Sequence, residues 1–146
     1  MFYSDQRHTL RQQFFITWQR FRKQEIIVEP LEQQILQVML DHPEFHPIFD
    51  NPAKYLDKDY SFEGNETNPF LHLSLHLTLR DQIATDRPQG IKAIYQQLLV
   101  RYQGDRIATE HAILPLLVQT LWQAQQSQQP FNEQQFLTCL QQLLCK

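Results

Sequence analysis

Two histidines one helical turn apart form the pair in this sequence that best fits a chemical role. His72 and His76 lie in the mostly apolar run 69–77. At about 100° per residue they share one side of a helix, and the opposite side carries Ser74, Thr78, Asp81 and Thr85. That polar stripe is expected to face solvent, so both imidazoles are expected to point into the protein. Neutral imidazole is a good metal ligand, and this spacing lets two rings share one divalent ion.

A purely structural role for the two histidines is the alternative. Burying a polar group without a partner costs roughly 1–3 kcal/mol, so each ring needs a hydrogen bond if it binds no metal. A backbone carbonyl or a carboxylate supplies such a bond. Both interpretations therefore predict buried imidazoles, and they differ in what the rings contact.

Glu110 and His111 are the second pair of candidates. On a helix that begins near Asp105, Glu110 lies at the centre of the apolar face, with Leu114 and Leu117 beside it. His111 lies at the edge of that face. A carboxylate on an apolar face is a candidate metal ligand, a candidate general base, or the structural partner of His72 or His76.

The stretch 42–68 holds further candidates. It contains three prolines and no clean period, so it is expected to be one long ordered loop, within which residues 52–56 are the candidate for a short helical turn. His46 and Glu66 are its candidate ligands, within a wider set that also includes His42, Glu44 and Glu63. Residues 25–68 hold ten acidic residues and two lysines, whereas residues 1–24 hold five basic residues and one acidic residue. These two segments are expected to pair with each other, and the alternative is that the acidic loop attracts a divalent cation.

The regular segments of the chain are all predicted to be helices. Capping residues, prolines and apolar periods indicate helices over about 4–23, 30–41, 69–85, 88–102, 106–127 and 132–144. The buried stripes of the first two are expected to contain Leu10, Phe14, Trp18, Phe21, Leu31, Ile35, Val38 and Met39. The predicted fold is an all-α, single-domain helical bundle of five to six helices spanning residues 1–146.

Composition excludes several classes of protein. The net charge of −3 argues against a nucleic-acid binder, and no stretch approaches the roughly 18 apolar residues of a membrane span. Two cysteines and a polar N-terminus indicate a cytoplasmic protein. The sequence lacks the HExxH pattern of zinc proteases, the ExxH pair of ferritin-like proteins and the GxSxG turn of hydrolases.

The run Glu66-Thr67-Asn68-Pro69-Phe70-Leu71-His72-Leu73-Ser74-Leu75-His76-Leu77 resembles the signature of the bacterial family called domain of unknown function 1841. Three later segments are similar to that family's other recurring stretches: 86–91, 110–111 and 122–125. The resemblance covers nearly the whole chain. It implies a small cytoplasmic bacterial protein and supplies no activity.

Two functions follow as hypotheses. The first is a divalent-metal site for Zn, Fe, Mn or Ni built from His72, His76, Glu110 and His111; as an enzyme it would be a metal-dependent hydrolase, with a bound water activated by the ion. The second is a non-catalytic interaction module, in which the histidines are structural hydrogen bonders and an exposed helix face binds a partner or a second copy of the chain.

Overall fold

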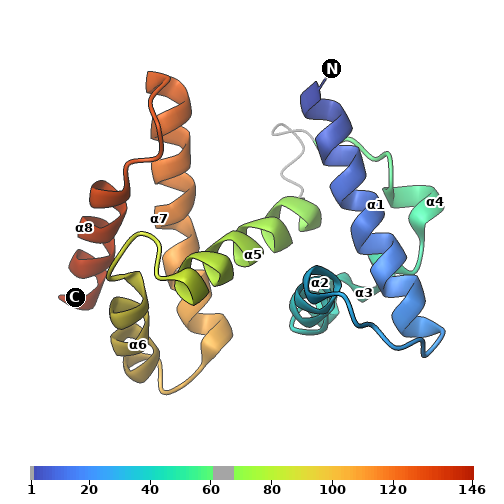
Figure 1. The fold of residues 1–146 in the computed structure, drawn as a ribbon, viewed down its shortest axis with the longest axis horizontal. Helices are drawn as coiled ribbons and strands as arrows, with labels where there is room; N and C mark the ends of the chain where they lie inside the picture. Colours follow the sequence, from blue (N-terminus) through green and yellow to red (C-terminus); the bar gives the residue numbers. More distant parts are fainter. Residues whose placement is uncertain (1, 61–67) are drawn as a thin grey trace. The chain divides into compact units, whose positions relative to one another are not determined.

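The computed structural model describes residues 2–60 and 68–146, and every regular element in these ranges is helical (Figure 1). The chain divides into two compact units, residues 1–74 and 75–146. The elements are α1 (Phe2–Arg22), α2 (Pro30–Leu40), the 3₁₀ turn η1 (Pro43–Phe45), α3 (His46–Phe49), α4 (Pro52–Tyr55), α5 (Pro69–Thr85), α6 (Ile91–Arg101), α7 (Arg106–Ser127) and α8 (Glu133–Leu144). The all-α prediction is confirmed, with more helices among the described residues than the five to six expected. The boundary between the units falls inside α5.

The first unit is held together by an aromatic core under α1. Phe14, Trp18 and Phe49 are almost completely buried, and their rings lie within van der Waals range of one another or of Phe70. Each such ring removes a large apolar area from water, and this burial stabilises the folded state by roughly 25 cal/mol per Å². This core fixes α1 against α3 and the start of α5.

Three positions of the predicted apolar stripes are more exposed than expected. Leu10 and Phe21 are over a third exposed and Leu31 is 58% exposed, so their assignment to the core was wrong. In α1 the buried stripe is centred on Phe14, Phe15 and Trp18. Leu10 and Phe21 therefore lie at the edge of that buried side of the helix. In α2 the neighbouring Glu32 is buried instead, because Arg20 neutralises its carboxylate.

The segment after α2 is more regular than the predicted long loop: the candidate helical turn at 52–56 is present as α4, and two further helical pieces precede it. Three short helical pieces, η1, α3 and α4, occupy residues 43–55, and each has proline within its first two positions. Proline fixes φ near the helical value and gives up a backbone donor that the first turn does not need, so these prolines start helical turns. The Asn51 side chain also caps α4 by accepting a bond from Lys54 N.

Opposite charges within the first unit pair as expected. Arg20 contacts Glu32 at 2.8 Å, and Arg22 contacts Asp50 at 2.8 Å. Asp50 also accepts a 2.7 Å hydrogen bond from Nε1 of Trp18. The basic first helix is thus neutralised by the acidic segment that follows it.

The second unit is built from α6, α7 and α8 around an aliphatic core. Its fully buried side chains are Leu79, Ile91, Leu98, Ile113, Leu117, Phe136 and Leu140. Asp105 caps α7 by accepting a bond from Ala108 N, and Asn132 caps α8 by accepting one from Gln135 N. The Asp105 cap therefore fixes where α7 begins, and the Asn132 cap fixes where α8 begins.

Candidate functional site

Helix α5 carries His72 and His76 as the sequence predicted. Asn68 caps it by accepting bonds from the backbone N–H groups of Phe70 and Leu71, and Pro69 is its first residue. The polar side of the helix is exposed at Thr78, Asp81 and Thr85. On the other side His76 is completely buried and His72 is half-buried.

In the first unit, His72 meets a second histidine, His42, which lies just after α2. Their ring centroids are 5.1 Å apart in an edge-on arrangement, and the His42 ring also stacks on Phe45. His42 is completely buried, and its Nδ1 lies 2.7 Å from the carbonyl oxygen of Val38. A carbonyl only accepts, so Nδ1 carries the proton, and in the neutral ring the lone pair belongs to Nε2.

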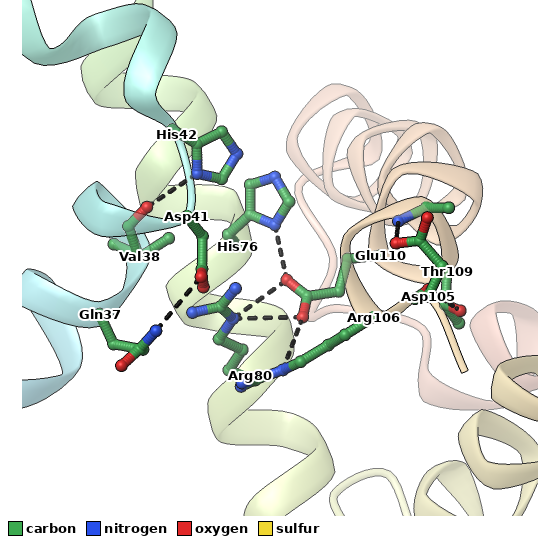
Figure 2. A network of polar contacts seen from close by, with 11 residues as sticks. Gln37, Val38, Asp41, His42, His76, Arg80, Asp105, Arg106, Thr109 and Glu110 are labelled. Carbon is green, nitrogen blue, oxygen red and sulfur yellow. Dashed lines mark hydrogen bonds and ion pairs between the residues drawn. The ribbon is translucent and has the colours of Figure 1, made fainter.

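In the second unit, His76 meets two residues of α7. Its Nδ1 lies 2.6 Å from Oε1 of Glu110, and its ring centroid lies 5.0 Å from that of His111 (Figure 2 shows the contact with Glu110). Glu110 is completely buried, as its position on the apolar face predicted, whereas His111 is exposed. The carboxylate accepts the Nδ1 proton, so in the neutral form of the ring the lone pair belongs to Nε2, as it does in His42.

Two arginines complete the surroundings of Glu110 (Figure 2). Arg80 Nε lies 3.0 and 3.2 Å from the two carboxylate oxygens, and Arg106 Nε lies 3.3 Å from Oε2. Burial by itself raises the pKa of Glu110, but the hydrogen bond from His76 and the charge of Arg80 outweigh it and leave the pKa below its ordinary value. Glu110 is therefore an ionised carboxylate in the core.

Each unit holds one pair of neighbouring histidine rings: His42 with His72 in the first unit, and His76 with His111 in the second. Within each pair the ligand nitrogens lie within 4.8 Å of each other. In the sequence of α5, His72 and His76 are one helical turn apart. Imidazole nitrogens are ligands for Zn²⁺, Fe²⁺ and Ni²⁺.

The two loop candidates have different outcomes. His46 lies in α3, where its Nε2 is 2.8 Å from the carbonyl oxygen of Met39 and its ring packs on Trp18 at 4.5 Å. That geometry gives His46 a packing role in the first unit. Glu66 and Glu63 lie outside the described residues. Of the wider set of loop candidates, His42 is the residue that lies beside His72. The sequence feature that could have singled it out is its position directly after a helix, next to Pro43.

The comparison with protein families decides the relationship of the chain. Residues 6–142 match the family described as domain of unknown function (DUF1841). The chain belongs to this family. The resemblance of the run around His72 and His76 is thereby confirmed, and the family's description names no activity.

No curated protein and no solved structure matches the chain significantly. Among residues 2–60 and 68–146, no helix has the length and hydrophobicity needed to cross a bilayer.

Proposed function

We propose that this DUF1841 protein binds one divalent transition-metal ion through imidazole ligands, with His72 and His76 of α5 at the centre of the site. The observation that carries the proposal is the arrangement of these two rings, each of which lies beside a further histidine of its own unit. With His42 and His111, the further imidazole of each unit, the proposed ligands are four ring nitrogens.

The tautomers of the buried rings support this set. His42 and His76 both direct Nδ1–H at an acceptor, Val38 O in one case and Glu110 in the other. Histidine ligands in metal sites commonly donate their second N–H to a carbonyl or a carboxylate, which fixes the ring and its tautomer. A nitrogen-only set favours Zn²⁺, Fe²⁺ or Ni²⁺ among the metals considered and disfavours Mn²⁺, which prefers oxygen ligands.

Exposure of His111 bears on whether the site is catalytic. Four imidazoles would close a tetrahedral Zn²⁺ site, whereas a hydrolytic site keeps one position for water. His111 is the exposed member of the four, so it is the ligand that a water could replace. A metal-dependent hydrolase is the reaction class consistent with that exchange, and the two free cysteines fit the reducing cytoplasm in which we place the protein.

Elemental analysis of protein purified without a histidine tag tests the proposal. We expect close to one metal ion per chain in the wild type. In His72→Ala and His111→Ala we expect at least a tenfold loss of affinity, which appears as a lower metal content. These two side chains are chosen because they are not fully buried. His8→Ala is the matched control, because His8 lies on the surface beside Asp57. Metal content that is negligible in the wild type, or unchanged in both variants, would refute the proposal.

One observation favours the second hypothesis, an interaction module. Val118, Leu121 and Trp122 form an exposed apolar side of α7, with Trp122 58% exposed. Large exposed aromatic residues are typical of interfaces. If the wild type holds no metal and sediments as a dimer that Trp122→Gln dissociates, this second function replaces the first.

A further inference from the structure

Glu110 is a completely buried charged group that the proposed ligand set leaves unused. Its side chain is 1% exposed and sits on the apolar face of α7, where an uncompensated carboxylate would be strongly destabilising. Three side chains of the second unit approach it: His76, Arg80 and Arg106 (Figure 2).

The two arginines make Glu110 unsuitable as a ligand in its observed arrangement. Nε of Arg80 donates to both carboxylate oxygens, and Nε of Arg106 contacts Oε2. Arginine is always protonated in proteins, so these contacts neutralise the negative charge that a metal ion would need. The contact between Nδ1 of His76 and Oε1 of Glu110 is the shortest of the three side-chain contacts of Glu110, at 2.6 Å.

We propose that Glu110 is a positioning residue for His76: it accepts the Nδ1 proton and so directs the Nε2 lone pair of that ring to the metal ion. This inference rests on the proposed metal site and adds a residue to it. Arg80 also helps to hold the carboxylate, because its Nε donates to both carboxylate oxygens, including the Oε1 that contacts His76. Carboxylate partners of metal-bound histidines typically account for 10–100-fold in metal affinity.

The test compares Glu110→Gln with Glu32→Gln. Glu32 is also a buried carboxylate held by an arginine, since it accepts bonds of 2.9 and 2.8 Å from Arg20, but it lies in α2 and contacts none of the four histidines in the described structure. Both changes remove one buried negative charge. A purely structural role for Glu110 predicts that the two folded variants bind Zn²⁺ with the affinity of the wild type.

Zn²⁺ affinity is measured by competition with a chromophoric chelator, at a temperature where circular dichroism shows each variant to be folded. We expect Glu110→Gln to weaken binding 10–100-fold and Glu32→Gln to change it less than threefold. Nitrogen-15 NMR of the histidine rings supplies the second readout: without metal, wild-type His76 is expected to be protonated at Nδ1, and Glu110→Gln to shift that ring toward the Nε2–H tautomer.

The outcomes separate the two proposals. Unchanged affinity in Glu110→Gln, together with loss of binding in His72→Ala, overturns the positioning role and leaves the metal site standing. An Nε2–H tautomer of His76 in the wild type also overturns the positioning role. Wild-type protein that binds no Zn²⁺ overturns the metal site, and the positioning role with it.

Discussion

Removal of the Glu110 carboxylate is the change whose energetic cost the structure defines best. Glu110→Ala deletes the acceptor of the His76 Nδ1–H and of Arg80 Nε at once. Both donor side chains are largely buried, with 0% of His76 and 13% of Arg80 exposed. Removing one partner of a buried charge pair costs about 3–5 kcal/mol, so we expect a loss of this size in the free energy of unfolding.

The third contact of Glu110 is worth much less. Arg106 is 52% exposed, lies one turn before Glu110 on the same helix, and is 3.3 Å away. Exposed pairs of this spacing contribute about 0.3–0.5 kcal/mol. Arg106→Ala is therefore expected to cost roughly a tenth of what Glu110→Ala costs, although both changes break an ion pair with the same carboxylate.

Urea unfolding of the wild type, Glu110→Ala and Arg106→Ala in the presence of a chelator measures these differences in the free energy of unfolding without any contribution from metal. The chelator matters because a bound ion would stabilise the folded state by mass action and add to the cost of losing a ligand's partner. Equal losses in Arg106→Ala and Glu110→Ala would contradict the assignment of the stabilisation to the buried contacts. A loss below about 1 kcal/mol in Glu110→Ala would contradict the burial of the network itself.

Two further predictions concern the first unit and the start of α6. The hydrogen bond from Arg22 lowers the pKa of Asp50, burial opposes this shift, and the bond from Trp18 adds to it, so the stabilisation is present at neutral pH and disappears as pH falls through the lowered value. Asp50→Asn should therefore cost less than about 1 kcal/mol at pH 7, since the pair is half-exposed, and the cost should vanish in acid-unfolding curves; a cost that grows below pH 4 would contradict the sign. Gly90→Ala should cost about 1–2 kcal/mol in thermal unfolding through backbone strain alone, because φ is +103° and an added Cβ meets nothing within 4 Å; no loss relative to Gln89→Ala would contradict it.

Local signals in the sequence predicted most of the helices. Asn68-Pro69, Asp105 and Asn132 act through bonds to backbone groups two or three residues away, so a single sequence contains all the information that these helix starts require. The burial of His76 and Glu110 was predictable for a related reason. Periodicity assigns each residue to a side of its own helix and needs no knowledge of the neighbouring helix.

Pairings between distant segments could not be predicted in the same way. Which donor meets Glu110 depends on how α5 packs on α7, and the sequence left His72 and His76 as equal candidates; the structure pairs Glu110 with His76. Arg80 lies one turn after His76, yet only the structure shows that it reaches the same carboxylate. His42 belongs to a segment without a period, so no helical side could be assigned to it.

Stability alone is a poor reason for these polar groups to be in the core. Replacing a buried ion pair by well-packed apolar residues is often neutral or stabilising, by about 1–4 kcal/mol, so an all-apolar seam between α5 and α7 would hold the second unit at least as well. The fixed tautomers are the more informative feature. A ring that only filled space could donate through either nitrogen, whereas His42 and His76 both donate through Nδ1, to acceptors of different chemical kinds on different helices. The feature that the two bonds share is the nitrogen left with the lone pair, and a lone pair held in a defined direction is what a metal ligand requires.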